Sequence, residues 1–264
     1  MCIVFSTFVF CNVFYLILHN VDNDLHKNKT VAKTAEGDNC VETNIQCPCG
    51  LIRAEVQLLG DNQTGAVSFT SVPSFLFIKD IIVNTPTFGI LKINISYGGA
   101  FYVVIDASSL GLDVKKTPLQ QLANAADEIT KTVSKGIPIT HPEIPDLSFL
   151  YGTILTDGND EHSEEPTANL CVFAEKEVDR SPTGSGVTAR CALQYAKGLL
   201  KPGEERTFEN SKTGSQFQAK IVEELRYRNY RSVRVKVRGE AFYTGTCKFT
   251  VEERDPFKDG FIIH

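Results

Sequence analysis

One run in the middle of the chain combines an acid, hydroxyl groups and two glycines. Residues Asp179–Val187 read DRSPTGSGV. Pro182 stiffens the backbone before the bend, whereas Gly184 and Gly186 permit backbone angles that other residues avoid. Because an apolar helical pattern follows, we expect free N–H groups at the positive end of a helix, where a carboxylate binds without an arginine.

The side chains of this run suit the other end of an amino acid. Thr183 lies at the bend, and its hydroxyl can face a ligand whose carboxylate rests on the amides of Gly184 and Ser185. Asp179 precedes Thr183 and can accept hydrogen bonds from a secondary ammonium group. The alternative is that Asp179 and Thr183 only cap the helix, a common role of these residue types. The residues alone leave both interpretations open.

Two helices are expected. The one after the bend has small and apolar residues at helical spacing, which predicts a buried central helix. Its stripe consists of Ala189, Ala192, Leu193, Ala196 and Leu200. In the other helix Thr117 is the expected N-cap, Pro118 the first helical residue and Gln120 the partner in a capping box, with Gly136 at the end. Its apolar face consists of Leu119, Leu122, Ala126, Ile129 and Val133.

The remaining pattern is typical of strands and places the chain in the α+β class. The predicted strands are Leu51–Leu59, Ala66–Val72, Phe75–Val83, Ile90–Ser96, Phe101–Ile105, Asp146–Leu155, Leu170–Ala174 and Val233–Val237. No glycine-rich dinucleotide motif follows a strand and no P-loop occurs, so the sequence does not support a nucleotide cofactor.

Composition favours a small-molecule substrate over nucleic acid. The chain has 264 residues, 42% of them hydrophobic, and a net charge of −5. Its one basic stretch, Arg226–Arg238, alternates valines with polar residues as a half-buried strand does. We therefore interpret this stretch as a strand with a solvated face and expect no nucleic-acid partner.

The cysteines and histidines do not form a predicted metal site. Of eight cysteines, Cys47 and Cys49 form a Cys-Pro-Cys pair, but no second pair and no histidine spacing completes a zinc set. We expect packed, reduced thiols, with a metal or disulfide as the less favoured alternative.

The start of the sequence is unusual. Ile3–Leu18 is almost continuously apolar, which could indicate a signal peptide or an anchor, yet it lacks a basic flank and a clear cleavage site and is short for a membrane span. We favour an incomplete gene model or alternative start, then a truncated product, over a signal or anchor.

Asp179–Arg190 (DRSPTGSGVTAR) resembles the second active-site motif of the proline racemase family, in the branch that dehydrates trans-3-hydroxy-L-proline and has threonine where racemases have cysteine. The similarity extends over most of Asn44–Ile263. It includes CPCGL (Cys47–Leu51), YGGAFY (Tyr97–Tyr102), FLYGTILTDG (Phe149–Gly158), NLCVFA (Asn169–Ala174), YTGT (Tyr243–Thr246) and DPFKDGF (Asp255–Phe261). The resemblance implies a diaminopimelate-epimerase-like fold, with two similar halves that each wrap a curved sheet around a central helix.

The resemblance also implies roles for individual residues. Thr183 would be the catalytic residue that flanks the substrate, and Asp179 would hold the ring nitrogen. Gly184 and Ser185 would bind the carboxylate through their amides. Phe173 would form the wall against the pyrrolidine ring, although a phenylalanine in a strand core explains it equally well. No cofactor is implied, whereas a homodimer and a cytoplasmic location are.

One element of the family is missing. The first motif, Met-Cys-Gly-His, supplies the catalytic base, and no Cys-Gly-His occurs in this chain. We therefore assign no catalytic cysteine and expect a truncated first half. The expected division is a leader at 1–39, a first-half remnant at 40–93, the second half at 94–239 and a segment returning to the first half at 240–264. The chain is then either an incomplete or inactive dehydratase or a catalytically dead amino-acid-binding or interaction protein. A racemase or hydroxyproline epimerase is less favoured, because a threonine hydroxyl cannot replace a thiolate.

Overall fold

The computed structural model describes residues 32–33, 39–60, 63–242 and 250–260. The apolar leader and the Tyr243–Thr246 segment lie outside them. One mixed sheet of thirteen strands organises the described residues, together with the helices α2 (Leu119–Gly136) and α3 (Gly184–Ala196). Neither described helix is long and apolar enough to cross a membrane.

Eight strands close into a barrel. In order around it they are β5 (Ser74–Thr85), β6 (Gly89–Tyr97), β7 (Phe101–Asp106), β8 (Leu150–Thr156), β9 (Thr167–Phe173), β11 (Glu205–Asn210), β12 (Gln216–Tyr227) and β13 (Tyr230–Gly239). Pairing of Val233 with Ser74 and of Ser232 with Phe75 joins the last strand to the first and closes the ring. Strand β10 (Glu177–Val178) is a short hairpin partner of β9.

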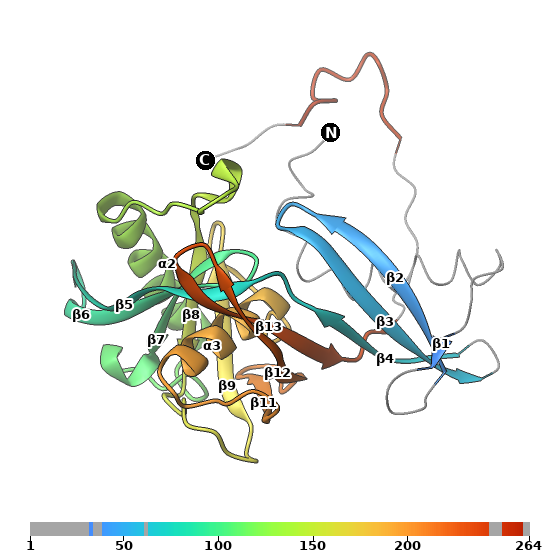
Figure 1. Ribbon diagram of the computed structural model, residues 1–264. Helices are drawn as coiled ribbons and strands as arrows, with labels where there is room; N and C mark the ends of the chain where they lie inside the picture. The colour runs from blue at the N-terminus through green and yellow to red at the C-terminus, as the bar shows by residue number, and fades with distance from the viewer. Residues whose placement is uncertain (1–31, 34–38, 61–62, 243–249, 261–264) are drawn as a thin grey trace.

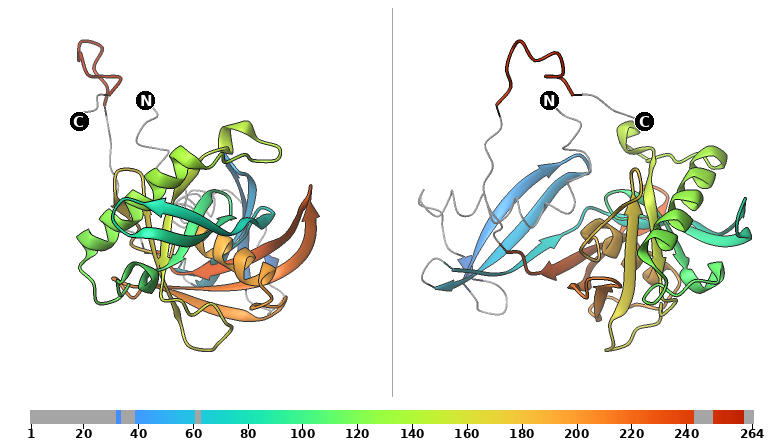
Figure 2. Two further views of the ribbon diagram at one scale, coloured as in Figure 1. Left: turned by 90° about the vertical axis from the view of Figure 1, so that its left-hand side faces the viewer. Right: turned by 180° about the vertical axis from the view of Figure 1, so that it is seen from behind.

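A second group of strands extends the sheet beyond the barrel. Strands β1 (Ala32–Lys33), β2 (Asn39–Cys47), β3 (Gly50–Gly60) and β4 (Gln63–Thr70) form this wing, which joins the barrel where β4 pairs with β13. The wing projects to one side of the barrel in Figure 1 and again from behind in Figure 2. Cys47 pairs with Gly50 at the turn of the β2–β3 hairpin, and the thiols of Cys47 and Cys49 are buried and unoxidised.

Helix α3 is the central helix predicted from the sequence. All its residues from Gly184 to Gln194 are buried, and it contacts β5, β6, β7, β12 and β13 (Figure 1). Gly98, between β6 and β7, lies so close to it that an added Cβ would be 2.2 Å from the carbonyl oxygen of Ser185 and 2.4 Å from the nitrogen of Ala189. A side chain at position 98 would therefore displace the start of the helix.

Helix α2 packs on the outside of the barrel against β8, β5 and β9. Of its predicted core face, all residues are buried except Leu119, which is exposed, and Ala123 and Ala125 are buried as well. The predicted cap is wrong. Pro118 is the N-cap, and the Thr117 hydroxyl instead accepts a hydrogen bond from the amide of Asp113 at 2.9 Å, within a tight turn that precedes the helix. The Gln120 side chain bonds Asn124 rather than closing a capping box.

Every predicted strand run overlaps an observed strand. The largest error of extent is at Pro145–Leu147, which form a 3-10 helix, so the run predicted from Asp146 becomes extended only at Leu150. The predicted runs do not include strands β1, β2, β10, β11 and β12.

Candidate functional site

The predicted bend forms and is strained. Thr183 has φ +68° and ψ 109°, a left-handed conformation that is rare for a β-branched residue. It occupies the N-cap position of α3, but its side chain makes no capping hydrogen bond. The first helical bond runs from the Val187 amide to the Thr183 carbonyl at 2.7 Å. The amides of Gly184, Ser185 and Gly186 therefore have no acceptor within the helix and none among the described residues, and these three groups are the free amides of the site.

The structure brings Asp179 and Thr183 together. The Thr183 hydroxyl donates to Oδ2 of Asp179 at 2.7 Å, while the amide and hydroxyl of Ser181 donate to Oδ1 at 2.8 and 3.0 Å. Both Asp179 and Thr183 are buried. The capping interpretation is thus wrong for Thr183, because its hydroxyl is hydrogen-bonded to the Asp179 carboxylate and not to an amide of the helix.

A tyrosine that the sequence analysis did not single out completes the helix start. The Tyr102 hydroxyl lies 2.7 Å from Oγ of Ser185, and both groups are buried. Burial, above all, raises the pKa of Tyr102 well above its ordinary value, with smaller contributions from Cys171 and Tyr151. The phenol is therefore neutral at physiological pH, and it fixes the Ser185 side chain beside the free amides.

Aromatic rings continue outward from Tyr102. The Tyr151 ring lies 5.5 Å from that of Tyr102 and 5.4 Å from that of Phe173 between centroids. Phe173 ends β9 and is only half-buried, and the Asp179 amide bonds the carbonyl of Cys171, two residues earlier on that strand. An aromatic row of Tyr102, Tyr151 and Phe173 therefore lies near the Asp179 loop, and the role predicted for Phe173 against the pyrrolidine ring stays a prediction.

Close contacts explain the two glycines of the helix start. A Cβ at Gly184 would lie 3.1 Å from the ring of Phe69, and one at Gly186 would lie 2.9 Å from Ile154. A cavity of about 10 Å³ adjoins Ser185 and Phe69, which is room for about one water molecule. A pyrrolidine ring is larger than this cavity, so its entry there would require a lining side chain such as Phe69 to move.

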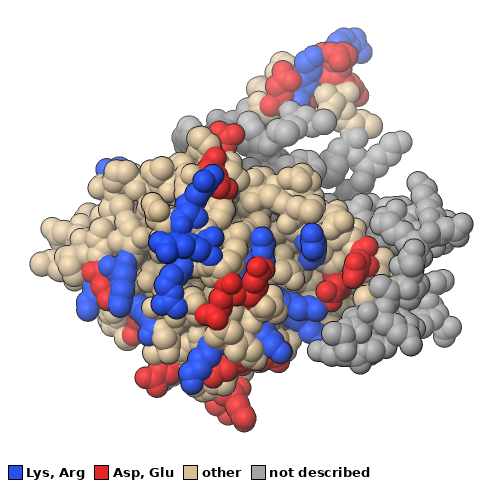
Figure 3. Space-filling model, viewed as in Figure 1, with Lys and Arg blue, Asp and Glu red and all other residues tan. Residues whose placement is uncertain are grey.

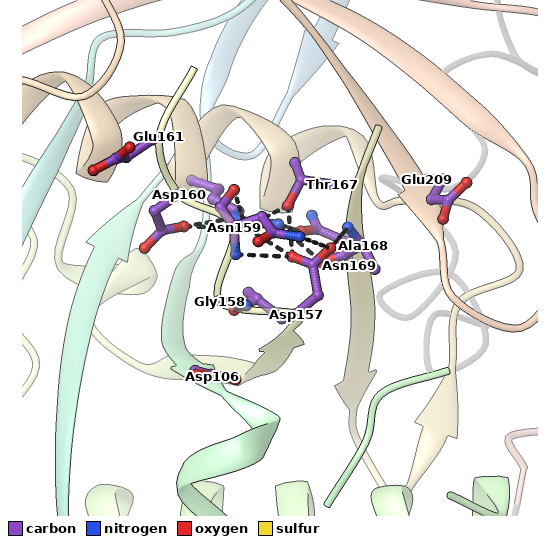
Figure 4. A network of polar contacts seen from close by, with 12 residues as sticks. Asp106, Asp157, Gly158, Asn159, Asp160, Glu161, Thr167, Ala168, Asn169 and Glu209 are labelled. Carbon is purple, nitrogen blue, oxygen red and sulfur yellow. Dashed lines mark hydrogen bonds and ion pairs between the residues drawn. The ribbon is translucent and has the colours of Figure 1, made fainter. Parts of the chain in front are cut away.

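A buried arginine on α3 ties the helix to the barrel end beneath the bend. Arg190 is fully buried, donates to the carbonyl of Ala168 and the hydroxyl of Thr167, and forms an ion pair of 3.0 Å with Asp160. Figure 4 shows the network to which these partners belong. Burial alone would raise the pKa of Asp157, but hydrogen bonds from Ala168 and Thr167, with the nearby guanidinium, bring it below its ordinary value. The sequence analysis missed this network because its members come from separate elements.

Comparison with known proteins identifies relatives along most of the chain. The model of the proline racemase family matches residues 32–262. The chain is 51% identical over 220 residues to the trans-L-3-hydroxyproline dehydratase of Xenopus tropicalis, covering 83% of this chain and 63% of that protein. It is 48% identical over 227 residues to the trans-3-hydroxy-L-proline dehydratase of Homo sapiens, covering 86% of this chain and 64% of that protein. The chain thus spans less than two thirds of the length of these relatives.

A solved structure agrees with the fold. A hydroxyproline epimerase of Agrobacterium vitis, solved with bound trans-4-hydroxy-L-proline, superposes with a TM-score of 0.84 at 24% identity over 96% of this chain and 69% of its own. The barrel around a central helix is accordingly diaminopimelate-epimerase-like, as predicted. With the fold, the Asp179–Val187 motif and the match over residues 32–262 in agreement, this chain belongs to the proline racemase family.

Proposed function

We propose that this chain carries the threonine side of a trans-3-hydroxy-L-proline dehydratase. The observation that carries the proposal is the buried pair of Asp179 and Thr183 ahead of the free amides of α3. The names of the relatives, at 48 and 51% identity, support the same substrate. In this arrangement the amides of Gly184 and Ser185 bind the substrate carboxylate, Asp179 accepts the ring ammonium, and Phe173 contacts the ring.

The proposed chemistry is a cofactor-independent elimination. A base removes the α-proton, the Cα–Cβ double bond forms, and the 3-hydroxyl departs with a proton as water. The resulting enamine tautomerises, by a proton shift from nitrogen to Cβ, to the cyclic imine pyrroline-2-carboxylate. The positive end of α3 stabilises the negative charge that gathers on the carboxylate as the proton leaves. A threonine hydroxyl is too weak an acid to return a proton as a cysteine thiol does, so Thr183 disfavours racemisation.

We expect this chain to bind the substrate with little or no turnover, because the 264 residues contain no Cys-Gly-His to supply the base. The second candidate function is an amino-acid-binding or interaction protein without catalysis. The same half-site supports it, since recognition of the carboxylate and ammonium does not require the base.

Two measurements on the purified chain test these proposals. Calorimetric titration with trans-3-hydroxy-L-proline should detect binding that Asp179→Asn weakens, and no heat of binding would overturn the substrate assignment. Incubation with the same compound, followed by detection of the cyclic imine product, should show no turnover above the Thr183→Ala variant. Turnover that depends on Thr183 would instead establish an active enzyme and require another base.

We also propose a cellular compartment and a kind of partner for this protein. Buried, unoxidised Cys40, Cys171 and Cys191 suit a reducing cytoplasmic compartment, and burial raises the pKa of Cys191 to about 12, so this thiol stays neutral. On the face in Figure 3, Lys and Arg lie among Asp and Glu. Lys236 forms an ion pair with Glu55, and Arg234 forms one with Glu223. This mixture favours a small molecule over nucleic acid as the partner. The homodimer stays a prediction.

A further inference from the structure

Resting on the proposed function, we propose that Asn169 and Asn210 are positioning residues for this half-site. They tie the carbonyls of the loop before α3 to the barrel, so that Asp179 and Thr183 face the free amides of the helix and the loop carbonyls face away from the bound carboxylate.

Four consecutive carbonyls of the loop accept hydrogen bonds from side chains. Nδ2 of Asn210 donates to the carbonyl of Asp179 at 2.7 Å and to that of Ser181 at 3.0 Å. Nδ2 of Asn169 donates to the carbonyl of Pro182 at 3.2 Å. Between them, the carbonyl of Arg180 accepts from the hydroxyls of Thr213 at 2.7 Å and Ser215 at 2.8 Å. All four backbone carbonyl oxygens of residues 179–182 are therefore hydrogen-bonded to side chains of the barrel strands and the turn that follows β11.

The orientation of each asparagine amide is fixed by its other partners. Oδ1 of Asn169 accepts from Nη1 of Arg190 at 2.7 Å, and a guanidinium can only donate. Oδ1 of Asn210 accepts from the amides of Lys212 and Thr213 at 2.9 and 3.0 Å. In each side chain the NH₂ group must consequently point at the loop. A rotation of the amide by about 180° would break both the bonds that Nδ2 donates and those that Oδ1 accepts.

The two asparagines also share one place in the fold. They are direct neighbours across the parallel pair of β9 and β11, where Asn210 lies opposite Asn169. Both are buried, and the Ser211 amide bonds the Asn169 carbonyl at 3.2 Å. Two rigid strands thus present the donors side by side, as expected of a support that holds a strained bend.

The function of this support follows from electrostatics. A carbonyl oxygen that turned toward the substrate carboxylate would repel it and would offset the attraction of the amides. The strained φ of Thr183, which places its hydroxyl on Asp179, also needs a surrounding that holds it. Loss of the Asn210 donor would release two carbonyls at once, whereas loss of the Asn169 donor releases one.

The test uses the purified chain, labelled with ¹⁵N, and the variants Asn210→Ala and Asn210→Gln. We expect trans-3-hydroxy-L-proline to shift the amide resonances of Gly184, Ser185 and Gly186 in the wild type. Asn210→Ala should weaken this binding at least about tenfold, because misplaced helix amides would lose one or two hydrogen bonds to the charged carboxylate of the ligand. Asn210→Gln, which keeps the amide, should recover part of the affinity.

The matched control is Asn94→Ala. Asn94 is also a buried asparagine, but its Oδ1 accepts a hydrogen bond from the amide of Asp80, far from the loop in sequence. The Asn94→Ala variant should change the affinity for trans-3-hydroxy-L-proline less than about twofold. Wild-type affinity in a folded Asn210→Ala variant, or equal losses in Asn94→Ala and Asn210→Ala, would overturn the proposal. If Asn210→Ala does not fold, Asn169→Ala, which releases only the Pro182 carbonyl, should weaken binding about threefold, and its failure to do so would overturn the proposal.

Acetate separates this inference from the proposed function. If acetate shifts the three amides and the hydroxyproline does not, the substrate assignment fails, and the loss of the acetate response in Asn210→Ala then supports the positioning role. If neither compound shifts them in the wild type, the anion site itself is absent and the positioning role is refuted.

Discussion

The hydroxyl of Thr183 donates a 2.7 Å hydrogen bond to Oδ2 of Asp179, and both residues are buried. A carboxylate is acceptor-only, so this bond fixes the hydroxyl hydrogen and leaves the oxygen lone pairs of Thr183 facing elsewhere. Acid and hydroxyl therefore act as one unit, and substitutions of either should affect the other.

Replacement of the threonine by cysteine tests the chemistry. We expect Thr183→Cys alone to create no proline racemase activity, because racemisation needs a thiol on each face of the α-carbon and the chain has no Cys-Gly-His. The measurement is exchange of the α-proton of L-proline into D₂O by NMR. Wild-type protein is the control, and detectable exchange by the variant would contradict the assignment of a single-sided site.

Removal of the charge on Asp179 tests recognition of the amine. Asp179→Asn should raise the dissociation constant for trans-3-hydroxy-L-proline about tenfold to a hundredfold, the range of one hydrogen bond to a charged group. Calorimetric titration measures it. Asp113→Asn, at an exposed turn, serves as the control. Equal affinities of Asp179→Asn and the wild type would exclude Asp179 from ligand binding.

The sequence was sufficient to predict those parts of the structure that depend on residues close together in the chain. The spacing of apolar residues located both helices, and the composition of residues 179–187 predicted the bend and its free amides. Contacts between residues that are distant in the chain could not be predicted in this way. Asn210 lies 31 residues from Asp179, and nothing in their types marks the pairing.

Local irregularities explain other errors. Strand β12 begins with the buried alternation Phe217, Ala219, Ile221, but the apolar Val222 then lies on the exposed face, and a bulge follows between Ile221 and Glu223. The alternation that predicts a strand is therefore lost midway. The expected cap at Thr117 failed for a similar reason, because its hydroxyl has a competing donor in the preceding turn.

Arg190 provides a stability prediction. Replacement of this buried residue by methionine would remove the guanidinium that pairs with the carboxylates of Asp157 and Asp160, and loss of one member of a buried ionic network typically costs about 3–5 kcal/mol of unfolding free energy. Urea denaturation monitored by circular dichroism measures it. Arg228→Met removes an exposed ion pair with Glu143 and should have a small effect. Similar midpoints for the two variants would show that the Arg190 network is not stabilising.

His141 predicts how stability depends on pH. The imidazole is buried among the rings of Tyr97, Phe101 and Tyr227, and its Nδ1 accepts from the amides of Glu143 and Ile144 at 3.2 and 2.9 Å. Burial lowers its pKa, and the nearby Glu143 carboxylate opposes this only in part. The unfolded chain therefore takes up a proton near pH 6.5 that the folded chain resists, so stability is full above that pH and falls as the pH drops below it.

The variant His141→Asn should remove this decline. The asparagine Oδ1 can take the place of Nδ1 as acceptor for the two amides, but it does not titrate. We expect the free energy of urea unfolding to fall between pH 7.5 and 5.5 in the wild type and in the exposed control His162→Asn, and to change less in His141→Asn. Because the carboxyl groups whose pKa is lowered, such as Asp157, titrate below this window, they leave the comparison unaffected. Parallel pH profiles for all three proteins would refute the role of His141.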